Sequence, residues 1–143
     1  MKNLCSAALA ALLLITSSPA VAQEAELVIE TADDVVLSEF KWTNRVLVVF
    51  ADSPLDPNFS EQIALLTARP LPLVARDVVV LTDTDPDTPS EVRRTLRPRG
   101  FALVLVDKDG RVMLRKPDAW DVREISRAID KTPLRQQEIR EGL

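Results

Sequence analysis

Three short apolar runs, rich in β-branched residues, set the strongest limit on how this 143-residue chain can fold. They cover residues 45–50 (RVLVVF), 77–82 (DVVVLT) and 101–106 (FALVLV). Runs of this length and composition are typical of strands that are covered on both faces of a sheet. The chain is therefore expected to form one α/β domain with helices packed on both faces of a central sheet.

The segment between the first two runs carries helix signals. Asp56 and Pro57 suit the start of a helix, and Asn58 as N-cap with Glu61 three residues later is an alternative start. The buried face is expected to carry three apolar residues at helical spacing: Phe59, Ile63 and Leu66. Strand, helix and strand in this order predict a right-handed parallel crossover.

The second half of the chain predicts a hairpin between two helices. Thr88 is expected to cap a short helix, and the DKDG turn, which ends at Gly110, joins the third run to a fourth strand at 112–115. Asp118 is expected to cap the last helix, whose inner face carries Val122, Ile125, Ala128 and Ile129. The order β-α-β-(α)-β-β-α predicts a mixed four-stranded sheet, which is the thioredoxin-like plan.

The first 22 residues have the composition of a secretory signal peptide. Lys2 supplies the positive charge, residues 4–15 are apolar, and residues 20–22 form an A-x-A cleavage motif. An uncleaved N-terminal anchor is the alternative. We expect a periplasmic or secreted protein with no membrane span after cleavage. Its mature chain would comprise a lead-in at 23–36, a domain at 37–133 and a polar tail at 134–143.

The mature chain would contain neither cysteine nor histidine. Cys5 is the single cysteine and lies in the predicted signal peptide, and the sequence has no histidine at all. Thiol nucleophiles, disulfides and the usual zinc or copper sites therefore cannot be built from residues 23–143. We expect no metal and no cofactor. The net charge of −4, with both signs mixed along the chain, also argues against nucleic-acid binding.

Four blocks of the sequence carry a family resemblance. They are LSEFKWTNRVLVVFA (37–51), RDVVVLTD (76–83), RGFALVLVDKDGRVMLR (99–115) and IDKTPLRQQEIR (129–140). On these blocks the chain resembles the domain of unknown function (DUF) family 4174, a thioredoxin-like group of secreted bacterial proteins. Related domains occur at the ends of some animal extracellular-matrix proteins. The family carries no established activity, so the resemblance implies a fold and does not imply a reaction.

The chain departs from redox thioredoxins in two places. The loop 51–57 (ADSPLDP) has Ser53 and Asp56 near the positions where the reactive cysteines would be. The position before the third run, usually a cis-proline, is Phe101, and Pro98 falls three residues too early. Thiol exchange requires a thiolate that attacks and leaves, and a serine hydroxyl cannot replace it. Thiol-redox catalysis by the mature chain is therefore excluded.

Two loops are the candidate docking edge. The first follows the strand at 45–50 and can present polar groups at a helix N-terminus, although turn and capping chemistry would use the same residue types. The second follows the basic run RRTLRPRG (93–100), which either binds an anion or is a solvated helix face. Phe101 would be a partly exposed apolar spot between them. The candidate binding residues are Asp52, Ser53, Asp56, Arg97, Arg99 and Phe101.

Two further patterns have ordinary explanations. The DTDPD stretch (83–87) suggests calcium, but Thr88 and Arg94 stand where an EF-hand loop needs glycine and glutamate, which favours a solvated acidic loop. Three aromatic residues are expected to pack in the core or as a helix staple, with recognition as the alternative: Phe40, Trp42 and Trp120.

The leading hypothesis is an exported, non-catalytic binding module whose partner is another envelope or extracellular protein. One alternative is a cryptic hydrolase that uses Asp52 and Asp56 as acid and base, which requires both carboxylates to line one pocket. The other is an accessory subunit that docks on a cysteine-bearing redox partner.

Overall fold

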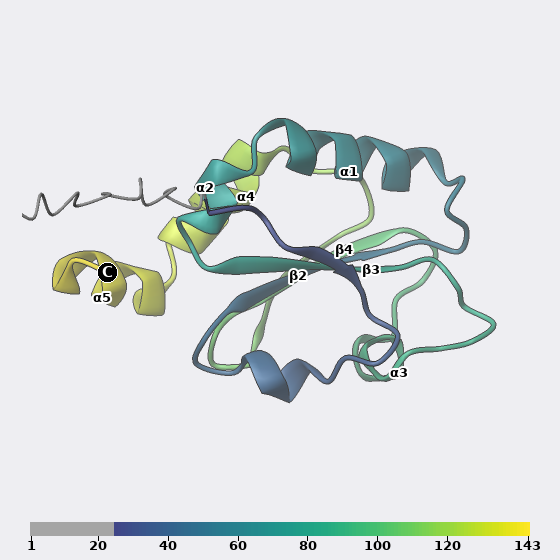
Figure 1. Cartoon of the computed structure of the whole chain (residues 1–143), viewed down its shortest axis with the longest axis horizontal. Helices are drawn as coiled ribbons and strands as arrows, with labels where there is room; N and C mark the ends of the chain where they lie inside the picture. The colour runs from purple at the N-terminus through teal and green to yellow at the C-terminus, as the bar shows by residue number, and fades with distance from the viewer. Residues whose placement is uncertain (1–24) are drawn as a thin grey trace, which may run out of the picture.

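The computed structural model describes residues 25–143, and its centre is a five-stranded mixed sheet in the order β1-β3-β2-β4-β5 (Figure 1). The predicted signal peptide at 1–22 lies outside the described residues. Strands β1, β3 and β2 are parallel, whereas β4 runs antiparallel to both β2 and β5. The strands are β1 (Ile29–Thr31), β2 (Arg45–Phe50), β3 (Val78–Asp83), β4 (Ala102–Val106) and β5 (Val112–Lys116).

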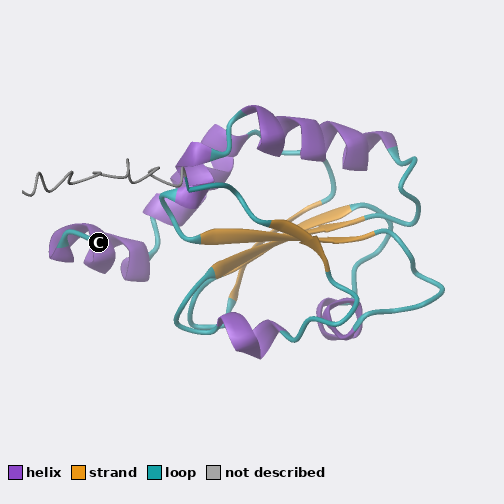
Figure 2. Ribbon diagram, in the orientation of Figure 1, coloured by secondary structure: helices purple, strands orange, loops and turns teal. Residues whose placement is uncertain are grey.

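Helices cover both faces of this sheet, as the buried strands require (Figure 2). On one face lie α1 (Pro57–Ala68), α2 (Leu71–Val74) and α4 (Val122–Asp130). On the other lie the 3₁₀ helix η1 (Leu37–Phe40) and α3 (Glu91–Leu96), while α5 (Pro133–Glu141) lies beyond one end of the sheet. Within residues 25–143 no helix is both long and apolar enough to span a membrane.

Strand β2 shows how the sequence produces two cores. Leu47 and Val49 point into the layer under α1, α2 and α4, whereas Val48 and Phe50 point into the layer above α3 and η1. All four are fully buried. Successive side chains of a strand alternate between faces, so an unbroken apolar run can fill both layers. The predicted α/β, thioredoxin-like architecture is confirmed in these elements.

The prediction of four strands missed β1. Residues 29–31 pair in parallel with β3 at the edge of the sheet, and all three are exposed. Backbone pairing with β3, and not side-chain burial, holds this strand in the sheet. Its sequence, IET, therefore has no apolar alternation from which a strand could be predicted.

The start of α1 follows the prediction, whereas the starts of α3 and α4 do not. Asp56 caps α1, since its Oδ1 accepts from the Asn58 amide at 2.8 Å. The prediction of Thr88 as the α3 cap is wrong, because Ser90 occupies that position. Likewise, Asp121 and not Asp118 caps α4. In both cases several capping residues precede the helix, and the packing of the helix against the sheet decides which one is used.

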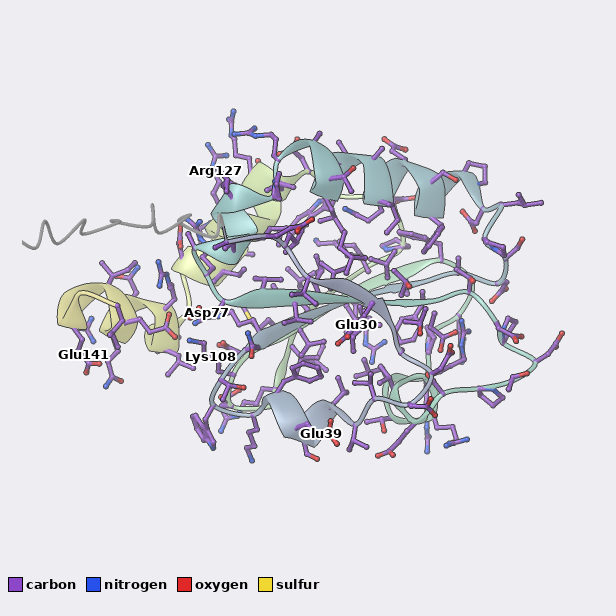
Figure 3. The ribbon with its side chains drawn as sticks, in the orientation of Figure 1. Glu30, Glu39, Asp77, Lys108, Arg127 and Glu141 are labelled. Carbon is purple, nitrogen blue, oxygen red and sulfur yellow. The ribbon has the colours of Figure 1, made fainter. Side chains whose placement is uncertain are left out.

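Helix α5 occupies the segment expected to be a polar tail. Thr132 caps it, and Glu138 of this helix is buried at the N-terminal end of β2. There Glu138 Oε1 and Oε2 each accept from the guanidinium of the fully buried Arg45 at 3.2 Å. Lys108 and Arg135 also contact this carboxylate, at 2.9 Å and 3.0 Å. Figure 3 shows Lys108 beside Asp77 at this end of the sheet, facing α5.

Acid is expected to weaken this attachment of α5. Burial disfavours the charged Glu138 carboxyl, but hydrogen bonds from Lys108, Arg45 and Arg135 outweigh burial and lower its pKa from 4.5 to about 2. A lowered pKa stabilises the fold above the unfolded-state pKa, and this contribution disappears as the pH falls from about 4.5 to about 2. The loss corresponds to about 3 kcal/mol.

Urea unfolding at a series of pH values measures this effect. In the Glu138→Gln variant, the free energy of unfolding should lose most of its pH dependence between about 4.5 and 2. The remaining slope should come from other carboxyls such as Asp130, whose pKa is also lowered, chiefly by its hydrogen bond from Arg76. Equal slopes in the two proteins would contradict the assignment of this acid sensitivity to Glu138.

Candidate functional site

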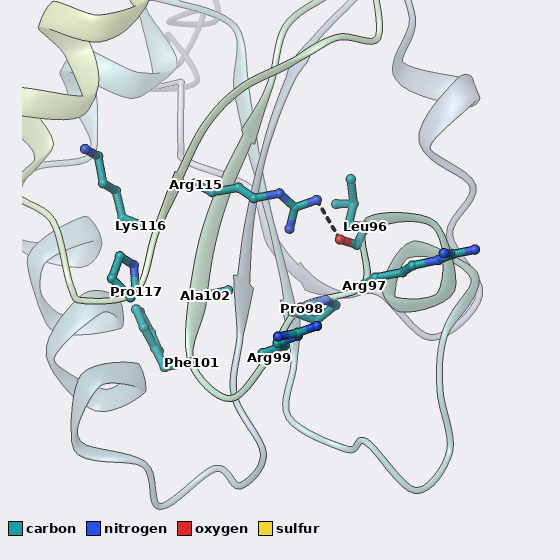
Figure 4. A pocket seen from close by; sticks show the side chains of 9 residues that line it. All are labelled: Leu96, Arg97, Pro98, Arg99, Phe101, Ala102, Arg115, Lys116 and Pro117. Carbon is teal, nitrogen blue, oxygen red and sulfur yellow. Dashed lines mark hydrogen bonds between the residues drawn. The ribbon is translucent and has the colours of Figure 1, made fainter.

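A cavity of about 470 Å³ lies between the turn that follows α3 and the end of β5 (Figure 4). Its position follows from strand pairing, because Leu103 of β4 faces Lys116 of β5 and brings the start of one strand to the end of the other. Nine residues line it: Leu96, Arg97, Pro98, Arg99, Phe101, Ala102, Arg115, Lys116 and Pro117. We call this the basic cleft.

The basic cleft combines an apolar lining with four cationic side chains, and no carboxylate lines it. Arg97, Arg99 and Arg115 are exposed, and Lys116 is half-buried. None of the four forms an ion pair with a carboxylate of residues 25–143, whereas seven other cationic side chains do. Positive charge at this site is therefore left without compensation from the described part of the chain.

The four side chains differ in direction. Figure 4 shows Arg115 extending from β5 across the cleft to the Leu96 carbonyl, to which its guanidinium donates a hydrogen bond. Arg99 lies beside Pro98, whereas Arg97 points outwards. Lys116 points away from this group, with its Nζ 4.3 Å from the centre of the Trp120 ring. Arg99 and Arg115 are thus the cations best placed to meet a ligand in the cleft.

Helix α3 supports one wall of the cleft. The helix ends at Arg97, whose φ of 50° is left-handed and whose amide donates to the Arg93 carbonyl at 2.8 Å. This conformation turns the chain sharply towards Pro98 and Arg99. A left-handed residue after a helix is a common way to end it, although glycine adopts this conformation more easily than arginine does.

The buried Arg93 fixes α3 to the ends of β2 and β3. Its Nε donates to Asp83 Oδ1 at 3.0 Å, and its Nη2 donates to the carbonyls of Ala51 and Asp83 at 2.9 Å and 3.1 Å. Burial disfavours the charged Asp83, but hydrogen bonds from Arg93 and Ser90 outweigh burial and lower the pKa of this carboxyl. The acidic loop and the basic run are thus joined by a buried ion pair.

Three of the six predicted docking residues line the basic cleft and three do not, although the pairing of Phe50 with Ala102 brings the two loops side by side as expected. Arg97, Arg99 and Phe101 line the basic cleft. Phe101 directly precedes β4, and no peptide bond within residues 25–143 is cis. The expectation that Phe101 is partly exposed is wrong, because only 8% of it is exposed and it packs in the core under α1 and α4. It contributes to the apolar lining of the cleft.

Of the other three predicted residues, Ser53 and Asp56 have turn and capping roles, and Asp52 is near a cation. Asp52 is an exposed side chain whose Oδ1 lies 3.9 Å from Arg93 Nη1. Ser53 Oγ accepts from the Leu55 amide at 3.1 Å, and Asp56 caps α1. None of the three lines the basic cleft. The geometry required by the carboxylate hydrolase alternative, with Asp52 and Asp56 lining one pocket there, is absent from this site.

Sequence reasoning missed the contribution of Arg115, Lys116 and Pro117. The expected strand at 112–115 did not by itself place these residues beside Arg97 and Arg99. The signal was the hairpin itself, because a tight turn after residue 106 returns the chain beside the start of β4. Counting back along the hairpin from the DKDG turn would have placed these residues next to Ala102.

The two other sequence patterns are the acidic stretch at 83–87 and the three aromatic residues. Asp85 and Asp87 are exposed, and Asp85 accepts from the amides of Asp87 and Thr88, as expected for a solvated acidic loop, whereas Asp83 departs from this expectation because it is buried against Arg93. No group of three or more His, Cys, Asp or Glu side chains within the described range is arranged to hold a metal ion. Phe40 and Trp120 pack against the core as expected, but the same expectation for Trp42 is wrong, because 65% of this residue is exposed.

Comparison with solved structures supports the fold. The reduced 2-Cys peroxiredoxin of Plasmodium vivax matches with a TM-score of 0.56 and 20% identity, over 73% of this chain and 85% of that chain. The N-terminally modified Prx1a of Plasmodium yoelii matches with a TM-score of 0.52 and 22% identity, over 76% and 83%. Reduced desulfothioredoxin from Desulfovibrio vulgaris Hildenborough gives 0.52 and 18%, over 75% and 99%. At these identities the similarity concerns the fold alone.

Comparison with family sequence models identifies a family. The family described as "Domain of unknown function (DUF4174)" matches residues 36–138, which is most of the described chain and includes the basic cleft, the Asp83–Arg93 pair and Glu138. The four sequence blocks, the thioredoxin-like architecture and this match agree, and the chain therefore belongs to the DUF4174 family.

Proposed function

We propose that this protein is an exported, non-catalytic binding module that recognises an acidic, partly apolar segment of another envelope or extracellular protein. The observation that carries the proposal is the basic cleft, whose lining combines apolar residues with four cations that have no carboxylate partner within residues 25–143. A segment that alternates acidic and apolar side chains matches both properties. Its carboxylates would meet Arg99 and Arg115, and its apolar side chains would contact Pro98, Phe101 and Pro117.

Electrostatics supports an anionic ligand. The whole chain carries a net charge of −4, yet every charged side chain that lines the cleft is positive. A local field of this kind increases the rate at which an oppositely charged partner associates and orients it on arrival. Planar guanidinium groups also favour carboxylates, because two N–H groups can donate to two oxygen atoms at once.

Residue chemistry supports a binding role over catalysis. Residues 23–143 contain no cysteine and no histidine, which removes thiolate nucleophiles and the most common general base. In the loop at 51–57, Ser53 and Asp56 are used in local turn and capping hydrogen bonds. The proposal of export rests on the first 22 residues, whose charge, apolar stretch and A-x-A motif match a signal peptide.

Charge reversal at the cleft tests the proposal. A fluorescent peptide that alternates glutamate and leucine should bind with saturable anisotropy, and its affinity should fall as the salt concentration rises. Arg99→Glu should weaken this binding by about tenfold or more, because it places a like charge against the ligand. The matched control is Arg94→Glu, which changes an exposed arginine of α3 that does not line the cleft.

Equal effects of Arg99→Glu and Arg94→Glu would show that net charge, and not the cleft, attracts the peptide. Crosslinking extends the test to the native compartment, with a photoreactive residue at Pro98 compared against one at the exposed Glu39, which does not line the cleft. A partner captured at Glu39 and absent at Pro98 would overturn the proposed docking surface.

A further inference from the structure

A second cavity, of about 570 Å³, lies at the opposite end of the β4–β5 hairpin, between the hairpin turn and α5. It is separate from the basic cleft and shares no residue with it. The hairpin contributes Asp107, Asp109, Arg111, Val112 and Met113, and the α5 side contributes Thr132, Pro133, Leu134, Gln137 and Arg140. Trp42, from the turn before β2, completes the wall.

Trp42 is held in an exposed and unfavourable conformation. Its φ is 69°, which bulky residues rarely adopt, and 65% of the residue is exposed. The Trp42 amide donates to the Lys108 carbonyl at 2.7 Å, which fixes the turn to the hairpin. Lys41 Nζ, at 5.9 Å from the ring centre, is at the outer limit of a cation–π contact. A strained backbone thus holds a large aromatic surface in solvent at the edge of a cavity.

The charges in this cavity compensate one another. Asp107 Oδ1 lies 3.0 Å from Nε of the buried Arg45, and Asp109 Oδ2 lies 3.6 Å from Arg111 Nε. With Arg140, the lining holds two carboxylates and two guanidinium groups. The cavity therefore has no overall charge preference, in contrast to the basic cleft. Its polar lining offers planar donors and acceptors next to an aromatic face.

We propose that this cavity binds the pyranose rings of a neutral polysaccharide whose ring hydroxyl groups are equatorial. A ring with equatorial hydroxyl groups has an apolar C–H face that stacks on an indole, and hydroxyl groups at its edge that hydrogen-bond to planar polar side chains. Trp42 supplies the indole face for stacking, and Asp109, Gln137 and Arg140 supply the planar polar groups for hydrogen bonding. The volume lies within the range of about 300–1,000 Å³ that is usual for small-molecule sites.

The walls of the cavity are held in place before a ligand arrives. Glu138 anchors α5 to Arg45 and Lys108, and so fixes the helix that carries Gln137 and Arg140. On the other wall, the Lys108 carbonyl holds Trp42. Preorganised walls reduce the conformational entropy lost on binding. This inference does not rest on the proposed recognition of an acidic segment, because the two cavities lie at opposite ends of the hairpin and share no residue.

Tryptophan fluorescence provides a selective test, because the chain contains only two tryptophans, Trp42 and Trp120. In the Trp120→Phe variant, Trp42 is the single reporter. Titration with cellohexaose or chitohexaose should give a saturable change in its emission. Sorbitol, which has hydroxyl groups but no ring face, should give none. By calorimetry, Trp42→Ala should weaken binding of the responding hexaose by about tenfold or more.

Gln137→Ala is expected to weaken binding less than Trp42→Ala does, and thermal unfolding of each variant shows that the fold is retained. The exposed Gln136 of the same helix does not line the cavity, so Gln136→Ala is the matched control. The proposal is overturned if neither hexaose binds, if sorbitol gives the same response, or if Trp42→Ala binds as tightly as the wild-type protein.

Discussion

Replacing Arg45 by leucine should lower the free energy of unfolding by about 3 kcal/mol or more. Arg45 is fully buried, and its guanidinium contacts Glu138, Asp107 and the backbone carbonyl of Arg76. Leucine leaves the buried Asp107 without its nearest cation and removes a donor from the Arg76 carbonyl. Removing one member of a buried ion pair is costly because the other charge stays desolvated.

Urea unfolding followed by circular dichroism measures this loss. The matched control is Arg127→Leu, which breaks the half-exposed pair with Glu124 on α4 and should change the free energy by less than about 1 kcal/mol. Adding Glu138→Leu to Arg45→Leu should cost less than the sum of the two single changes, because the two residues share one interaction. Comparable losses for Arg45→Leu and Arg127→Leu would contradict a structural role for the buried cluster.

Replacing Arg93 by leucine should have a similarly large effect, about 3 kcal/mol or more, and should also impair the basic cleft. The change leaves Asp83 buried without its cation and leaves the Ala51 carbonyl without the Nη2 donor. It also releases α3 from the ends of β2 and β3. Because α3 ends at Arg97, the wall that carries Arg97 and Arg99 would lose its support, and binding of the acidic peptide should weaken together with stability.

The Arg93→Lys variant tests whether the positive charge of Arg93 or the planar shape of its guanidinium group stabilises the fold. Lysine keeps the positive charge near Asp83, but it lacks the planar guanidinium group that donates to the carboxylate and to two backbone carbonyls at once. The free energy of unfolding of the lysine variant should therefore lie between that of the wild type and that of Arg93→Leu. Arg94→Leu, one residue away on the exposed face, is the control and should change stability by less than about 1 kcal/mol. A lysine variant as stable as the wild type would show that charge alone suffices.

The sequence predicts the parts of the fold that depend on burial. Three β-branched runs identify β2, β3 and β4, because a strand covered on both faces must be apolar along its length. Strand β1 follows no such rule, since its residues are exposed and its hydrogen bonds are to the backbone. Helix α5 was missed for a related reason, since its buried residue is a glutamate that needs Arg45, 93 positions away, to be neutralised.

The candidate site was predictable only in part. Arg97, Arg99 and Phe101 follow from the position of the loop before β4, which the topology places at the end of the sheet. Arg115 and Lys116 depend on hairpin register, and Trp42 depends on a left-handed backbone that no local pattern indicates. Periodicity reports which side chains are buried, whereas a cleft is built by exposed side chains whose spacing carries no such signal.

The buried contact between Arg45, at the start of β2, and Glu138, in α5, has a consequence for biosynthesis. As the polypeptide emerges with its N-terminal half first, the cation at position 45 has no carboxylate from α5 until residue 138 has followed it. A product that stops short of that point would keep only Asp107 as a carboxylate partner for the buried Arg45 and should be more prone to proteolysis. The contact thus makes synthesis through the last helix a condition for a durable fold.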